Sequence, residues 1–212
     1  MGNNDSHCLR LLNLYHMNDK KLIAITGGIG SGKTVVSKML IAMGYEVYDC
    51  DSRAKMLMDN DENIKARLVS EVHPECVICG VIDRKLLAAK VFSDADALAS
   101  LNRIVHSAVR ADLSDWSAES DARVKFVETA ILYQSDLDFM VDEVWEVVAP
   151  VDLRIERVQA RNNATRDEVM SRISVQEAYD PGRMHPCRRV LVNDGAEPLL
   201  PQIEHYLNLL SK

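Results

Sequence analysis

The segment GGIGSGKT, residues 27–34, carries the clearest chemical pattern in the sequence. It fits G-x-x-x-x-G-K-[ST], in which a glycine-rich loop turns backbone N–H groups toward phosphates. In this pattern the lysine bridges the β- and γ-phosphates of a nucleoside triphosphate, and the final hydroxyl binds Mg²⁺. We predict a triphosphate site in which Lys33 is also catalytic and Thr34 holds Mg²⁺. The predicted binding residues are Gly28, Ile29, Gly30, Ser31, Gly32, Lys33 and Thr34.

The residues around this loop support phosphate binding. An apolar run, residues 22–26, precedes it and a helical pattern starts near Lys33; this strand–loop–helix order is the context that confirms the motif. The opposing interpretation, a structural turn, is weak because such turns rarely use four glycines in six residues. The chain has no N-K-x-D motif, and no D-x-x-G motif follows its third predicted strand. A GTPase is therefore disfavoured.

Two carboxylates, Asp49 and Asp51, follow the second predicted strand. In open α/β sheets, ligand-contacting residues lie at the carboxyl ends of strands. One carboxylate can face Mg²⁺ while the other accepts a proton from an attacking hydroxyl. We predict both to be catalytic, with Asp49 on the metal side, and the spacing leaves open which one is the base. Arg53 can bind a substrate phosphate. An aspartate before a helix is also a common N-cap, so capping is the competing interpretation.

Arginines dominate the segment from residue 154 to residue 189, which contains no lysine although the whole chain has a net charge of -7. Guanidinium groups bind two phosphoryl oxygens at once and stay charged. A helix pair carrying them can close over ATP and stabilise the transferring phosphoryl group. We predict that Arg157 binds ATP and Arg161 is catalytic, and that the other arginines are structural. The eight arginines are Arg154, Arg157, Arg161, Arg166, Arg172, Arg183, Arg188 and Arg189.

Five short apolar runs position these residues, and they alternate with helical patterns. Such alternation predicts a parallel sheet covered by helices. The predicted strands are residues 22–26, 45–49, 124–129, 144–149 and 190–193. Between the second and third strands, about seventy residues have helical periodicity and no convincing strand. We interpret them as a helical insertion that contributes a substrate pocket.

Composition favours a cytoplasmic protein. The chain has 212 residues, 47% hydrophobic and 27% charged, as is ordinary for a globular protein. Its acidic balance disfavours nucleic acid and anionic membranes as partners. Its five cysteines do not form a disulfide framework, and Cys76 and Cys79 lack the second ligand pair of a zinc site. The first residues lack the charged-then-apolar pattern of a signal peptide; residues 1–18 are expected to be an unstructured extension, with Met17 a candidate start.

Taken together, these segments resemble the dephospho-CoA kinase family over about residues 21–212. The resemblance rests on the order and spacing of several motifs, and the phosphate loop alone is far less specific. These motifs are ITGGIGSGKT (25–34), YDCDSRA (48–54), LNRIVH (101–106), ETAILY (128–133), VAP (148–150), RISVQ (172–176) and VNDG (192–195). The family implies transfer of the γ-phosphoryl of ATP to the 3′-hydroxyl of dephospho-CoA, giving CoA and ADP, with Mg²⁺.

The resemblance also implies an architecture and several residue roles. Asp51 would be the general base or the carboxylate on the Mg²⁺ side and would contact the substrate, with Asp49 assisting. His106 and Arg53 would lie on the acceptor side, and Asn193 near the adenine of ATP. From its apolar helical pattern alone, His106 would be a packing residue. The expected fold is a three-layer P-loop fold with a five-stranded parallel sheet. Its expected parts are a core (about 19–59, 120–150 and 186–212), a CoA-binding insertion (about 60–119) and a lid (about 151–185).

Other functions compete with this expectation. Another small P-loop kinase acting on a nucleoside or nucleotide would share the loop, the carboxylates and the arginines. A binding protein that holds ATP without turnover would be expected to lack Lys33 or the aspartate pair, and this chain has both. We expect a monomer or a weak homo-oligomer with dephospho-CoA and ATP as ligands.

Overall fold

The computed structural model describes residues 20–210, which form two compact units. The helical unit spans Tyr48–Glu119, and the core unit consists of the chain on either side of it. The predicted extension at residues 1–18 lies outside the described residues. Within those residues, no helix is both long enough and apolar enough to cross a membrane.

A five-stranded parallel sheet forms the centre of the core unit, as the sequence predicts. Its order, β2-β5-β1-β6-β7, places β1 between β5 and β6. Lys21 of β1 is opposite Val124 of β5, and Ile23 is opposite Glu143 of β6. The strands are β1 (Lys21–Thr26), β2 (Glu46–Asp49), β5 (Val124–Glu128), β6 (Glu143–Val148) and β7 (Arg188–Val192). The three central strands are largely buried, and their apolar residues include Ile23, Phe126 and Trp145, although Lys125 and Glu143 are buried there too.

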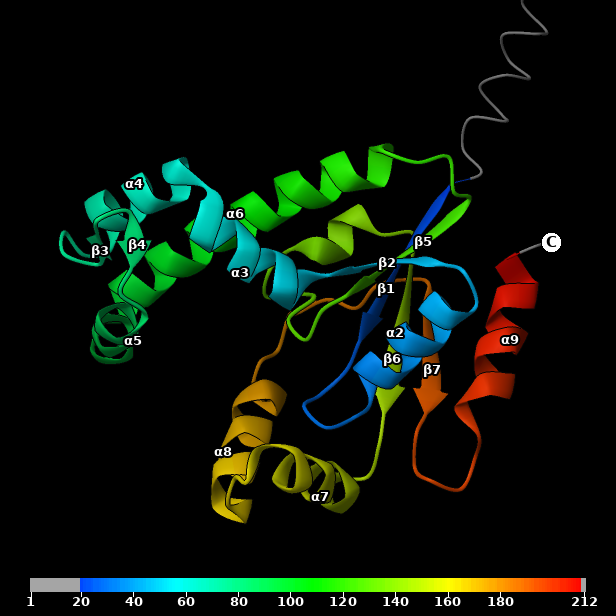
Figure 1. Ribbon diagram of the computed structural model, residues 1–212. Coiled ribbons are helices and arrows are strands. Elements are labelled where there is room, and N and C mark those ends of the chain that lie inside the picture. Colours follow the sequence, from blue (N-terminus) through cyan, green and yellow to red (C-terminus); the bar gives the residue numbers. More distant parts are fainter. Residues whose placement is uncertain (1–19, 211–212) are drawn as a thin grey trace, which may run out of the picture. The chain divides into compact units, whose positions relative to one another are not determined.

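Helices α2 (Lys33–Ala42) and α9 (Leu199–Leu210) pack against one another and against the sheet, on the same side in Figure 1. Their buried residues Leu40 and Ile203 join the main hydrophobic cluster with Phe126 and Trp145. The Phe126 and Trp145 rings are 5.1 Å apart, centroid to centroid, and both side chains are fully buried. This cluster fixes the end of β1 and the start of α2, and therefore the two ends of the phosphate loop.

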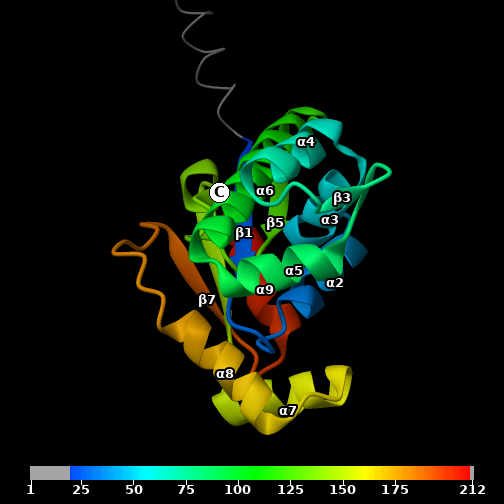
Figure 2. The ribbon, with the colours of Figure 1, turned by 90° about the vertical axis from the view of Figure 1, so that its left-hand side faces the viewer.

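A second helix pair, α7 (Val151–Asn162) and α8 (Arg166–Glu177), follows β6. The two helices lie side by side in Figures 1 and 2 and share a cluster that includes Ile155 and Val169. A capping box fixes the start of α8, since Thr165 accepts from the Glu168 N–H and the Glu168 side chain accepts from the Thr165 N–H. Both helices fall within the predicted lid. A short 3₁₀ helix, η1 (Leu137–Met140), precedes β6.

The helical unit contains four helices whose starts follow one rule. Each begins after an aspartate whose carboxylate accepts hydrogen bonds from backbone N–H groups of the first turn. The helices are α3 (Cys50–Asn60), α4 (Glu62–Glu71), α5 (Arg84–Ser93) and α6 (Ala95–Ala118). The first three pack on α6, whose Ile104 is fully buried with Leu68 of α4.

The prediction that this region has no strand is wrong at one place. Two short strands, β3 (Val77–Ile78) and β4 (Val81–Ile82), form an antiparallel hairpin. Cys79 and Gly80, both at positive φ, make its turn. Strands of two residues are too short for a period-2 pattern to be recognised. The helical unit also begins at Tyr48 and so includes α3, whereas the predicted insertion starts near residue 60.

Candidate active site

The phosphate loop connects β1 to α2 in the core unit. Gly27, Gly30 and Gly32 have φ values of 143°, 78° and 106°, which a residue with a side chain rarely adopts. The Lys33 Nζ donates to the carbonyl oxygens of Gly27 (2.8 Å) and Gly28 (3.3 Å), so the lysine folds back over the loop. Helix α2 begins at Lys33, as the sequence predicts, whereas phosphate binding by the loop stays a prediction.

Arg157 and Asn193, both predicted to bind ATP, contact the carbonyl groups of this loop. The Arg157 Nη1 donates to the carbonyl oxygens of Gly30 and Ser31, at 3.4 Å each. The Asn193 Nδ2 donates to the Ser31 carbonyl oxygen at 2.7 Å. Arg157 also donates from Nη2 to the Asn193 backbone oxygen (3.1 Å) and Oδ1 (3.2 Å). The structure thus brings these residues together at the loop, where they hold carbonyl oxygens.

Arg154 is the loop contact that sequence reasoning missed. Its Nε donates to the Ile29 carbonyl oxygen at 2.9 Å, and its Nη1 pairs with Glu177 at 2.9 Å. The neighbouring Gln176 accepts from the Ile29 N–H at 2.8 Å. The side chain of Arg154 is only 10% exposed. Its three-residue step from Arg157 on one helix face was the available signal, because residues three apart on a helix point the same way.

A cavity of about 380 Å³ opens beside the loop, within the core unit. Its lining includes Ser31, Tyr133, Arg154 and Gln176. Two buried atoms of these residues, the Ser31 Oγ and the Arg154 Nη2, have no hydrogen-bond partner among residues 20–210. Buried polar atoms are nearly always paired, so unpaired ones beside a phosphate loop are consistent with a polar ligand.

Arg161 differs from the other two arginines of α7. It is exposed near the end of the helix, and in the described part of the chain its one hydrogen bond goes from Nε to the Asn162 Oδ1 (3.1 Å). The structure therefore does not bring Arg161 to the loop, and its catalytic role stays a prediction.

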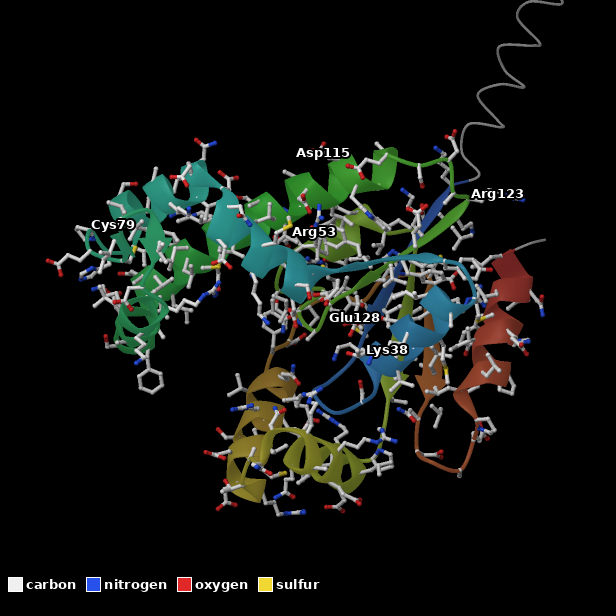
Figure 3. All side chains as sticks on the ribbon, in the orientation of Figure 1. Lys38, Arg53, Cys79, Asp115, Arg123 and Glu128 are labelled. Carbon is white, nitrogen blue, oxygen red and sulfur yellow. The ribbon has the colours of Figure 1, made fainter. Side chains whose placement is uncertain are left out.

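Thr34 faces a carboxylate that sequence reasoning did not select. The Thr34 Oγ1 donates to the Glu128 Oε1 at 2.8 Å. Glu128 ends β5, the strand beside β1, and Figure 3 labels its side chain there. A hydroxyl and a carboxylate are the oxygen donors that Mg²⁺ takes, with phosphates and water completing its shell. These residues fit the ion; the position of Glu128 at a strand end was the signal that could have found it.

Asp49 and Asp51 behave differently in the helical unit. Asp49 caps α3, because its Oδ1 accepts from the N–H groups of Asp51 (3.0 Å) and Ser52 (3.4 Å). Its Oδ2 accepts from the Ser52 Oγ at 2.6 Å. No described residue donates a hydrogen bond to the Asp51 carboxylate, which is exposed. The capping interpretation is therefore confirmed for Asp49, and the carboxylate of Asp51 is available for chemistry.

Arg53 is held rigidly inside the helical unit. Its Nε and Nη2 donate to the two oxygens of Asp112, at 2.7 Å each, and the Tyr48 hydroxyl donates to the same carboxylate at 2.6 Å. Burial opposes ionisation of Asp112, but the hydrogen bonds from Arg53 and Tyr48 outweigh it and lower its pKa. The hydrogen bond to Asp112 raises the pKa of Arg53. His106, the other predicted acceptor-side residue, is partly buried on α6.

The fold and the site together define a class of protein. A glycine-rich loop between a central parallel strand and a helix, with a lysine folded over it and a hydroxyl–carboxylate pair beside it, is typical of P-loop nucleotide-binding proteins, the class that includes the P-loop kinases. Residues 21–198 match the family model described as dephospho-CoA kinase, and the chain belongs to that family.

Individual relatives agree with this assignment. The dephospho-CoA kinase of Porphyromonas gingivalis is 35% identical over 181 residues, which cover 85% of this chain and 90% of the relative. A Thermus thermophilus crystal structure superimposes with a TM-score of 0.73 at 34% identity, covering 90% of this chain and 96% of that one. The dephospho-CoA kinase from Campylobacter jejuni shares the fold, with a TM-score of 0.64 at 18% identity over 91% of this chain and 98% of that one.

Proposed function

We propose that the protein phosphorylates the 3′-hydroxyl of dephospho-CoA with ATP, giving CoA and ADP, the last step of CoA biosynthesis. One observation carries the proposal: the family match runs over residues 21–198 and so includes both the phosphate loop and the whole helical unit. A kinase for another acceptor would share the loop, but a match through the helical unit would not be expected of it.

The proposed reaction is a phosphoryl transfer. The ribose 3′-oxygen bonds to the γ-phosphorus, the bond between that phosphorus and the β,γ-bridging oxygen breaks, and ADP leaves. Lys33 and Arg161 neutralise charge on the phosphoryl oxygens. Because the transition state of such transfers is loose, charge neutralisation and alignment contribute more than proton removal.

We assign the base role to Asp51 and not to Asp49. A base needs a carboxylate oxygen that can reach the substrate hydroxyl. Both oxygens of Asp49 accept hydrogen bonds from the first turn of α3, one of them from the N–H of Asp51 itself. Asp49 therefore orients the Asp51 backbone, while the exposed Asp51 carboxylate accepts the proton. A magnesium-side role of Asp49 remains a prediction.

On the acceptor side, Arg53 and His106 are proposed to bind dephospho-CoA. Support for Arg53 comes from its bidentate ion pair with Asp112, which fixes the guanidinium while leaving its side chain 35% exposed. A cation held in one orientation loses less entropy when it binds an anionic group.

Mg²⁺ is the metal that we propose for the reaction, held by Thr34 and Glu128. When bound, it would neutralise charge on the β- and γ-phosphates. Before the ion binds, Glu128 fixes the rotamer of the Thr34 hydroxyl through their 2.8 Å hydrogen bond.

We also propose a cytoplasmic monomer or weak homo-oligomer. All four cysteines in the described part of the chain, Cys50, Cys76, Cys79 and Cys187, are free thiols, as is usual in a reducing compartment. In the same residues, no group of three or more potential metal-ligating side chains suggests a structural metal.

The test is ADP formation by the purified protein with Mg·ATP, comparing dephospho-CoA with adenosine, other nucleosides and nucleoside monophosphates. Mass spectrometry of the product is expected to show one added phosphoryl group on dephospho-CoA alone. Phosphorylation of a different acceptor, with none on dephospho-CoA, would keep the kinase and reject the substrate.

A further inference from the structure

We propose that Arg154 is a positioning residue for ATP binding: it fixes the outward orientation of the Ile29 carbonyl, and with Arg157 and Asn193 it holds the phosphate loop in its binding conformation. This inference rests on the proposed use of ATP. It concerns only residues of the core unit, all of which lie in α7, in the loop, or just after β7.

The orientation of peptide units gives the physical reason. The C=O of one residue and the N–H of the next belong to one planar unit and point in opposite directions. The carbonyl oxygens of Ile29 and Ser31 are held by Arg154 (2.9 Å) and by Asn193 (2.7 Å). The N–H groups in the same peptide units, those of Gly30 and Gly32, therefore point away from these side chains.

The N–H groups of Gly30 and Gly32 can donate hydrogen bonds to a ligand. No described residue accepts a hydrogen bond from the N–H of Gly30 or Gly32, whereas the Ser31 N–H donates to the Gly28 carbonyl oxygen at 3.1 Å. N–H groups turned to one side of a glycine-rich loop are what binds phosphate oxygens in such loops. By holding the carbonyl oxygens, Arg154 and Asn193 thus orient the N–H groups of Gly30 and Gly32 for phosphate binding.

Arg154 packs so closely against the loop that it leaves no room for a side chain at two of the loop's glycines. A Cβ on Gly28 would lie 2.3 Å from the Arg154 Nη2, and a Cβ on Gly30 would lie 2.5 Å from the Arg154 backbone oxygen. Gly30 also has a positive φ, but Gly28 does not. The φ of Gly28 therefore does not require glycine, but a Cβ there would displace the Arg154 guanidinium from its hydrogen bonds.

A role in packing alone does not explain this arrangement. Burying a guanidinium that is 10% exposed is costly, and its partner Glu177 is itself 57% exposed. The neighbouring Ile29 already packs against apolar side chains of α7 and α8, including Ile155 and Val158. An apolar residue at position 154 would extend that cluster without the desolvation cost, but it would leave the Ile29 carbonyl without its donor.

The first experiment compares Arg154→Met with wild type by calorimetric titration of ATP and by steady-state kinetics. We expect ATP binding to weaken about tenfold or more and KM for ATP to rise in parallel, with KM for dephospho-CoA within twofold of wild type. Arg154→Lys keeps the charge but cannot make both side-chain contacts, so it should recover only part of the loss. The matched control is Arg166→Met, which removes an exposed arginine paired with Asp152 on the same helix pair, and it should match wild type.

A double-variant cycle tests whether the contact between Gly28 and Arg154 affects ATP binding. Gly28→Ala alone should weaken ATP binding, because its Cβ collides with the guanidinium. In the Arg154→Met background the same change should add less than twofold, because the colliding group is gone. Full additivity would show that Gly28 serves phosphate approach directly, and it would overturn the inference.

The outcomes separate this inference from the proposed function. A wild-type protein that neither binds ATP nor phosphorylates dephospho-CoA would reject the function. A wild type that does both, beside an Arg154→Met variant with unchanged ATP affinity, would reject only the inference. A variant that raises both KM values equally, in step with a lowered free energy of unfolding, would reduce Arg154 to a structural residue and would also reject the inference.

Discussion

Two substitutions at Asp49 separate its capping role from any role in catalysis. Asparagine keeps a side-chain oxygen at the position of Oδ1 and is as good an N-cap as aspartate, but it removes the charge. Alanine removes both. Asp49 accepts three hydrogen bonds at the start of α3. Asp49→Ala should therefore have a lower free energy of unfolding than Asp49→Asn, whereas the kcat values of the two variants should be similar.

The magnitude follows from the contacts. Loss of the side chain leaves the N–H groups of Asp51 and Ser52 without their protein acceptor at an exposed helix end, where water replaces it in part. Removal of an N-cap of this kind costs about 1 kcal/mol. Asp49→Ala should therefore lower the free energy of unfolding by about 1 kcal/mol and Asp49→Asn by only a few tenths. Asp49→Asn should lower kcat less than tenfold, whereas Asp51→Asn, which removes the base, should lower it about a hundredfold.

The assay combines urea denaturation followed by circular dichroism with initial rates measured over a range of Mg²⁺ concentrations. The reasoning is refuted if Asp49→Asn keeps full stability yet loses as much kcat as Asp51→Asn. It is equally refuted if Asp49→Asn requires much more Mg²⁺ for half-maximal rate, because Asp49 would then act on the metal side and not mainly as a cap.

Three further outcomes are expected. Lys33→Met should lower kcat/KM more than Asp49→Asn does, since charge neutralisation dominates a loose transition state; the opposite order in folded variants would contradict this. Glu128→Gln should raise the Mg²⁺ concentration needed for half-maximal rate, and an unchanged Mg²⁺ titration would exclude Glu128 from the metal site. Asp112→Asn should lower the free energy of unfolding by about 1 kcal/mol near pH 7 and raise KM for dephospho-CoA, since Arg53 loses its partner. Because folding lowers the pKa of Asp112, its contribution is present above its unfolded pKa of about 4 and is lost as pH falls through the folded value, so wild type and variant should converge in urea titrations at acid pH.

Much of the core could be predicted because its signals are local. Each of the five strands has four to six residues with an apolar part, and the predicted bounds agree with the structure to within two residues. The position of the phosphate loop could be predicted for the same reason, because its motif and its strand–loop–helix context are contiguous in the sequence. Local signals fail at the hairpin of Val77–Ile78 and Val81–Ile82, where strands of two residues give no period.

The candidate site was harder to predict because its contacts are distant in sequence. Glu128 reaches Thr34 across 94 positions, and only the pairing of β5 beside β1 brings them together. Asp112 reaches Arg53 across 59 positions through the packing of α3 on α6. Composition marked the arginine segment as unusual, but it could not show that Arg154 and Arg157 contact the loop while Arg161 is exposed at the helix end.

The glycines of the phosphate loop belong to a local sequence signal, but their neighbours are distant in sequence. Gly28 and Gly30 leave room for Arg154, and a Cβ on Gly32 would lie 2.1 Å from the Asn193 Nδ2. The glycines of this loop therefore leave room for side chains that lie 125 and 162 positions further along the chain. Gly28 has no positive φ, so its lack of a side chain indicates a close neighbour at its Cα. At position 28 this neighbour is the Arg154 guanidinium, whose Nη2 would lie 2.3 Å from a Cβ on the glycine.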